Sequence, residues 1–182
     1  MEIYESVPSV KIYILLSNTH SLLTRAIGLY TGEPYNHASI AFDEQLEEMF
    51  SFGRLQPRNP FIGGFVREDV ESGTFAHFTE TRCALYELLV TPEERQRVRA
   101  SVRQFEREKE KYSYNLIGFA GVATGHPIDR EHAYFCSQFV ATVLERGGVK
   151  VFDKPPGLVI PPDFQNNPRF TLIYEGKLSE YR

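Results

Sequence analysis

The sequence is poor in cysteine, in excess charge of one sign and in long hydrophobic runs, and each shortage removes a class of protein. Two cysteines, Cys83 and Cys136, are too few for a disulfide-stabilised scaffold and are expected to be separate free thiols. Lys and Arg number 20 against 24 Asp and Glu, so the formal net charge of −4 gives no general attraction to nucleic acid or anionic membranes. No apolar stretch approaches the ~20 residues that span a bilayer, and residues 1–6 lack the pattern of a signal peptide. The sequence therefore predicts a cytoplasmic protein with no nucleic-acid partner and no integral membrane segment.

Aromatic and aliphatic residues are plentiful enough to build a core, although tryptophan is absent. Hydrophobic residues make up 42% of the chain and aromatic residues 13%, with 14 Phe and 10 Tyr, which excludes a disordered chain and favours a β-rich core. The 182 residues contain no repeat, low-complexity segment or long linker, and this length suits one ordinary domain. A single domain covering residues 1–182 is therefore predicted.

Hydrophobic periodicity and turn residues predict a mixture of strands and helices. Thr91, Pro92 and Glu94 form the pattern of a helix N-terminus with a capping box. The stretch 53–73 is rich in glycine and proline and is predicted to be a long ordered loop. Strands are expected at 10–17, 37–42, 46–52, 75–80, 83–90 and 170–175, and helices within 19–30, 91–111, 112–124 and 133–147.

Cys136 is the first candidate for chemistry, because it lies near the start of the helix predicted at 133–147. The positive end of the helix dipole and the unpaired backbone N–H groups there favour a thiolate over a thiol. The same N–H groups can stabilise an oxyanion formed when the thiolate attacks a carbonyl. The alternative is that Cys136 is a small buried apolar residue, as most free cysteines are. Cys83, inside a predicted strand, is assigned to the core.

His37 is the candidate base for this thiol. It stands at the first position of a predicted strand directly after a turn-like segment, where an imidazole is both fixed and accessible. The alternative is a histidine that only completes the strand or the core. If the turn at 43–45 pairs Phe42 with Leu46, His37 lies opposite Ser51 on the same face of the sheet, and Ser51 is then expected to orient the imidazole.

Several segments resemble a known family. Residues 135–140, Phe-Cys-Ser-Gln-Phe-Val, look like the helix start of the NlpC-type papain-like cysteine peptidases and amidases, and residues 35–41 look like their histidine strand. Because His37 precedes Cys136, the chain resembles the circularly permuted branch that includes the YiiX-like proteins and relatives of lecithin retinol acyltransferase. Segments 110–118, 161–164 and 173–176 are similar to the tyrosine segment, the Pro-x-Asp element and the closing strand of that branch.

The resemblance implies an α+β fold in which an antiparallel sheet packs against helices, as a circularly permuted papain-like domain. It implies a thiol-dependent amidase or peptidase, in which His37 takes the proton of Cys136 and the thiolate forms a thioester with a small amide, peptide or acylated amine. This chemistry requires no metal or organic cofactor. Tyr112 is the first match to the tyrosine that assists the oxyanion site of the family, and Tyr114 is the second.

Four further residues are predicted to line the site, and Ser51 is predicted to complete it. Tyr35, Phe61, Tyr114 and Ser137 are expected to bind a small-molecule or peptide substrate, Tyr35 and Phe61 because of their positions in loops. Ser51 stands where many relatives place His, Glu, Asn or Gln as the third polar residue. A serine hydroxyl accepts the imidazole N–H but adds no charge that stabilises imidazolium. A backbone carbonyl or a water in that role stays open.

Three alternatives belong to other functional classes. A lipid-directed N-acyltransferase uses the same Cys–His chemistry but transfers the acyl group to an amine. A catalytically silent binding module keeps the fold without an activated thiol. A zinc protein would use His126, His132 and Cys136, although their irregular spacing matches no known ligand pattern. The sequence carries no indication of the oligomeric state.

Overall fold

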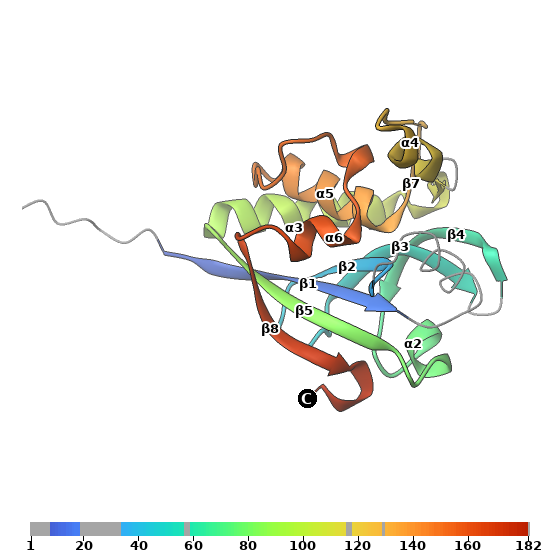
Figure 1. Cartoon of the computed structure of the whole chain (residues 1–182). Helices are drawn as coiled ribbons and strands as arrows, with labels where there is room; N and C mark the ends of the chain where they lie inside the picture. Colours follow the sequence, from blue (N-terminus) through green and yellow to red (C-terminus); the bar gives the residue numbers. More distant parts are fainter. Residues whose placement is uncertain (1–7, 19–33, 57–58, 116–117, 129, 182) are drawn as a thin grey trace, which may run out of the picture.

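The protein has an α+β architecture in which helices cover a twisted antiparallel sheet (Figure 1). The computed structural model describes residues 8–18, 34–56, 59–115, 118–128 and 130–181. The six strands lie in the order β4-β3-β2-β1-β5-β8, and every neighbouring pair is antiparallel. Their bounds are β1 (Val10–Asn18), β2 (His37–Ala41), β3 (Met49–Gln56), β4 (Asn59–Glu68), β5 (Arg82–Val90) and β8 (Phe170–Lys177).

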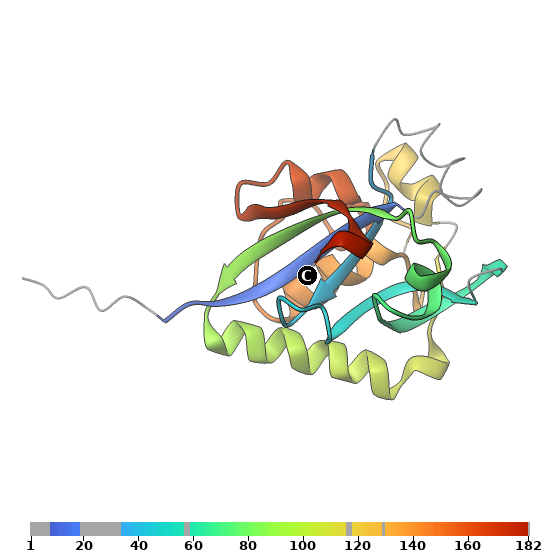
Figure 2. The same cartoon turned by 90° about the horizontal axis from the view of Figure 1, so that it is seen from below.

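The helices are divided unequally between the two faces of the sheet. The layer containing α3, α5 and α6 covers one face, and the short α2 and the C-terminal end lie on the other (Figures 1 and 2). A small parallel pair, β6 (Ser113–Tyr114) and β7 (Ala133–Tyr134), stands just before α5. The α-helices are α2 (Gly73–His77), α3 (Pro92–Arg107), α4 (Gly118–Thr124), α5 (Cys136–Arg146) and α6 (Pro161–Gln165); short 3₁₀ turns occupy Lys109–Lys111, Pro156–Leu158 and Leu178–Glu180.

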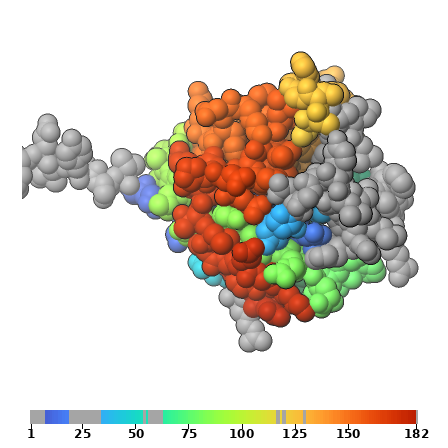
Figure 3. Space-filling model, viewed as in Figure 1, coloured from blue at the N-terminus to red at the C-terminus, as the bar shows by residue number. Residues whose placement is uncertain are grey.

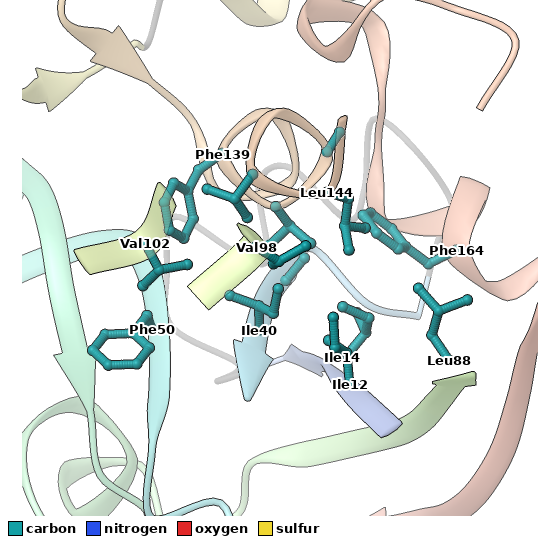
Figure 4. Close-up of a cluster of buried hydrophobic side chains, with 14 of the residues drawn as sticks. Ile12, Ile14, Ile40, Phe50, Leu88, Val98, Val102, Phe139, Leu144 and Phe164 are labelled. Atoms are coloured by element: carbon teal, nitrogen blue, oxygen red, sulfur yellow. The ribbon is translucent and has the colours of Figure 1, made fainter. Parts of the chain in front are cut away.

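Strand alternation builds an apolar cluster on each face. Because successive strand side chains point to opposite faces, Ile12 and Ile14 of β1 pack beneath the helices, whereas Tyr13 and Leu15 pack on the opposite face. Figure 4 shows the first cluster, in which strand residues such as Ile40 meet side chains of α3 and α5. The two clusters hold the helices and the sheet together. In the described ranges, no helix has the length and apolarity needed to cross a membrane.

The start of α3 confirms the predicted capping box. Thr91 Oγ1 accepts the N–H of Glu94 at 3.1 Å, and Glu94 Oε2 accepts the N–H of Thr91 at 2.8 Å. We expect Thr91→Ala to lower the free energy of unfolding by about 1 kcal/mol, because the Glu94 N–H loses its side-chain acceptor. Urea denaturation followed by circular dichroism measures this change. The exposed Thr79→Ala is the control, and equal midpoints for the two variants would contradict the prediction.

The predicted loop at 53–73 is wrong, because most of it forms the end of β3 and all of β4. Glycine is used there for close approach between strands. A Cβ at Gly63 would lie 2.9 Å from the Gly53 carbonyl oxygen and 2.9 Å from Tyr114 Cβ. Glycine therefore marks crowded backbone in this strand pair, and not a break in the sheet.

Other boundaries also differ from the predictions. The strand expected at 75–80 is wrong, since a single helical turn, α2, places Phe75 in the second cluster. The helix expected at 112–124 is confirmed only from Gly118, after β6. The helix expected within 19–30 lies outside the described residues.

Candidate active site

The hairpin between β2 and β3 sets the position of His37. The Asp43 carboxylate accepts the backbone N–H groups of Glu47 at 2.8 Å and Glu48 at 2.7 Å, which stabilises a turn longer than predicted. Phe42 N–H therefore donates to the carbonyl of Glu48 at 3.1 Å. The ladder pairs Ile40 with Phe50 and Ala41 with Met49, so its continuation sets residue 37 opposite 53 and residue 39 opposite 51. The prediction that His37 lies opposite Ser51 is wrong by two residues.

Glu68, the last residue of β4, is the hydrogen-bond partner of the imidazole. Its Oε1 lies 2.9 Å from His37 Nε2, and the two side chains are 9% and 18% exposed. Its Oε2 accepts a short hydrogen bond from the Ser39 hydroxyl. Gly53 leaves room for this arrangement, because a Cβ there would come within 3.4 Å of His37 Cε1 and of Ser51 Oγ. Three neighbouring strands thus supply one polar cluster.

Cys136 is the first residue of α5 and is 1% exposed. Its sulfur lies 4.0 Å from the carbonyl oxygen of Asn36, the residue before β2. The imidazole of His37 forms a side-chain hydrogen bond with the sulfur. Since Nε2 of His37 contacts Glu68, Nδ1 is the nitrogen that remains for Cys136. The backbone N–H groups of Ala38 and Ser137 also donate to the sulfur.

These contacts favour a thiolate and an imidazolium. Burial raises the pKa of Cys136, but the hydrogen bond and charge of His37 outweigh it, so the net pKa lies below the ordinary value of a thiol. Burial lowers the pKa of His37, but the charge of Glu68 and the hydrogen bond to Cys136 outweigh it, so the net pKa is raised. Burial raises the pKa of Glu68, yet His37, Ser39 and Ser51 together hold it below its usual range. The direction of each shift favours the charged form of its group.

The pKa of the second thiol, Cys83, is shifted in the opposite direction. Cys83 in β5 is fully buried, and burial raises its pKa to about 12. Its assignment to the core is confirmed. Any thiol reactivity of the native chain near neutral pH is therefore expected from Cys136.

The two predicted oxyanion tyrosines lie in different surroundings. The Tyr112 ring packs against Phe105 and Phe52 at centroid distances of 4.8 and 6.0 Å. Burial raises the pKa of Tyr112, with smaller electrostatic contributions from Glu108, Tyr134 and Arg146. The contacts that hold the Tyr112 ring are therefore aromatic packing contacts of the core. Tyr114 lies against Gly63, which in turn lies against Gly53, the residue that borders the His37 imidazole.

The other predicted substrate residues have structural partners. Tyr35 is 3% exposed, and its hydroxyl donates to Glu175 Oε1 at 2.6 Å, which fixes the segment before His37 to β8. The Ser137 hydroxyl donates to the carbonyl of Val159 at 2.7 Å. The side chain of Phe61 lies outside the described part of the chain.

In the space-filling view, the light-blue residues near the start of β2 reach the surface beside the red C-terminal part of the chain (Figure 3).

Sequence reasoning missed Glu68 and Ser39. Glu68 was hidden because the stretch that contains it was interpreted as a loop. Ser39 carried a usable signal, since it stands two residues after His37 and therefore on the same face of β2. Ser51 is 0% exposed and makes no hydrogen bond of ordinary geometry with the described residues, so it does not orient the ring directly.

The zinc alternative has no support in the structure. His126 Nδ1 lies 2.9 Å from the carbonyl oxygen of Thr124, and the ring of His132 packs against Tyr112 at 5.6 Å. In the ranges that the structure covers, no three His, Cys, Asp or Glu side chains gather as metal ligands would.

Comparison with known proteins gives no family for the chain. Neither a family model, nor a curated protein, nor a solved structure matches it. Any function assigned to the chain therefore rests on the geometry of its own residues, above all on the contact of one imidazole with both a thiol and a carboxylate.

Proposed function

We propose that the chain is a thiol-dependent hydrolase of amides or esters, with Cys136 as nucleophile, His37 as general acid and base, and Glu68 as the group that orients and charges the imidazole. The observation that supports this most is the bridging position of His37. Its Nε2 lies 2.9 Å from Glu68, and its ring also hydrogen bonds to the Cys136 sulfur. Glu68 supplies the negative charge that Ser51 lacks.

The chemistry follows from the charged pair. The Cys136 thiolate attacks a substrate carbonyl carbon, and the carbonyl π electrons move to oxygen to give a tetrahedral oxyanion. The oxyanion collapses, the bond to the amine or alcohol breaks, and the leaving group takes the proton of the His37 imidazolium. His37 then removes a proton from water, whose oxygen attacks the thioester and releases the acid. The thiolate and imidazolium are regenerated.

Backbone donors are available for the oxyanion. The first N–H groups of α5 have no acceptor within the helix, because the first intrahelical bond runs from Phe139 N–H to the carbonyl of Phe135 at 2.9 Å. Since the Ser137 N–H already donates to the sulfur, the Cys136 N–H and the helix dipole are the groups that we assign to the oxyanion. They replace Tyr112 in the proposed mechanism.

The scaffold we propose is a circularly permuted papain-like domain. It is supported by a helix that starts at the cysteine and packs against β2, the strand that starts at the histidine. The substrates that suit this chemistry are small amides, peptides or acylated amines.

Formation of an acyl-enzyme tests the proposal. We expect p-nitrophenyl acetate to acetylate Cys136 and to release p-nitrophenol in a burst, because the aryl ester needs little substrate recognition. Intact-protein and peptide mass spectrometry locates the acetyl group. Cys136→Ala is expected to abolish both signals, and Cys83→Ala is the matched control that keeps them.

The fate of the acetyl group separates the alternatives. Loss of the group to water supports the hydrolase, whereas a thioester that is stable in water and yields only to an added primary amine supports an N-acyltransferase. If Cys136 is not acetylated, and if it reacts with p-nitrophenyl acetate no faster than the thiol of the unfolded chain, the proposal of an enzyme is contradicted. The binding module is then the remaining alternative.

A further inference from the structure

Buried polar side chains lie at one end of the sheet face that carries the second apolar cluster. Ser39 of β2 pairs directly with Leu15 of β1, and Leu15 belongs to the second apolar cluster. Ser39 and Ser51 are both 0% exposed. Burying two hydroxyls and the Glu68 carboxylate costs free energy that apolar side chains at these positions would avoid. Their presence therefore indicates a role other than stability.

The Glu68 carboxylate is held at both oxygens. Oε1 contacts His37 Nε2 at 2.9 Å, and Oε2 accepts the short hydrogen bond from Ser39. The terminal torsion of a glutamate is broad, so a carboxylate held at one oxygen turns easily about that bond. The Ser39 hydroxyl removes this freedom. Because Ser39 stands two residues from His37 on the same short strand, it holds Glu68 in a fixed position relative to the imidazole.

We propose that Ser39 is a positioning residue, which fixes the Glu68 carboxylate in the orientation that keeps the His37 ring directed at Cys136. This inference rests on the proposed function. Ser39 acts through two other side chains, so its loss weakens the reactivity of the thiol without abolishing it. Ser51 lies beside the same carboxylate but makes no hydrogen bond of ordinary geometry with the described residues, so its loss has a smaller effect.

The pH dependence of Cys136 alkylation by iodoacetamide tests the proposal, in the full chain with Cys83 replaced by Ser. We expect Ser39→Ala to raise the midpoint by about one pH unit, because a loosened carboxylate stabilises the imidazolium less. Ser51→Ala is expected to raise the midpoint by less. Ser101→Ala, which removes a buried hydroxyl with no partner in the described part of the chain, is the matched control and is expected to leave it unchanged.

A spectroscopic readout separates positioning from a general structural role. Nitrogen-15 NMR of the His37 ring is expected to show the Nε2 resonance moving in Ser39→Ala and staying in place in Ser101→Ala, while Ser39→Thr, which keeps a hydroxyl, restores most of the parent signal. An unchanged midpoint and an unchanged resonance in Ser39→Ala, beside a displaced midpoint in Glu68→Gln, overturn the proposal and leave the proposed function intact. If Cys136 is unreactive in the parent and Glu68→Gln changes nothing, both fail together.

Discussion

Replacement of His37 by Ala is expected to slow the alkylation of Cys136 at pH 6 by at least about a hundredfold. In the parent protein the imidazolium holds the pKa of Cys136 below its ordinary value, which favours the thiolate. Without His37, burial remains and raises the pKa above the ~8.5 of a free thiol, at which less than about 1% is thiolate at pH 6. The thiolate is the reacting form, so the rate follows its fraction. The midpoint of the parent profile is expected at a lower pH than that of the variant profile, in keeping with the lowered pKa of Cys136.

The control for this experiment is another histidine of the same chain. His77 lies exposed at the end of α2, where its ring packs against Phe78, and His77→Ala is expected to leave the rate unchanged. Both variants carry Cys83→Ser so that only one thiol remains, and circular dichroism checks that they fold. Equal alkylation rates for the parent and His37→Ala at pH 6 would contradict the prediction that His37 activates the Cys136 thiol.

Replacement of Phe52 by Ala is expected to lower the free energy of unfolding by about 4 kcal/mol. Phe52 lies on β3 and is 0% exposed. Its ring joins the strand to the helical layer and to the segment before α5, and truncation to Ala leaves a large cavity among rigid neighbours. The rings within 5.2–6.0 Å of Phe52 are those of Phe65, Phe105, Tyr112, Tyr134 and Phe139.

Urea denaturation measures this loss, and two further variants interpret it. Leu55→Ala removes an apolar side chain from the same strand at a position that is 54% exposed, and we expect a change within about 0.5 kcal/mol. Phe52→Leu keeps most of the side-chain volume and is expected to fold. It allows the loss of stability to be measured even if Phe52→Ala does not fold. A loss below about 1 kcal/mol in Phe52→Ala, with an unchanged denaturant slope, contradicts the assigned packing.

The elements that sequence reasoning predicted best carry a strong local signal. The strand at 10–17 and the helix after Thr91 have clear periodicity and capping residues, and both are confirmed. The start of α5 at Cys136 is likewise close to its predicted place. The stretch that contains β4 was predicted to be a loop because of its glycines. Glycine occurs both in loops and where two strands pack closely, so its presence alone does not distinguish the two.

The sequence by itself determined that residue 136 is a cysteine near a helix N-terminus and that residue 37 is a histidine at a strand start. These are local properties, set by capping, periodicity and residue type. Only the tertiary structure decided that the hydrogen-bond partner of the His37 imidazole is Glu68. That choice depends on a two-residue difference in the β2–β3 turn, made by the Asp43 carboxylate, and on the pairing of β3 with β4. Strand register is a long-range property, because each pairing is selected by the contacts of a whole face and not by the residues of one strand.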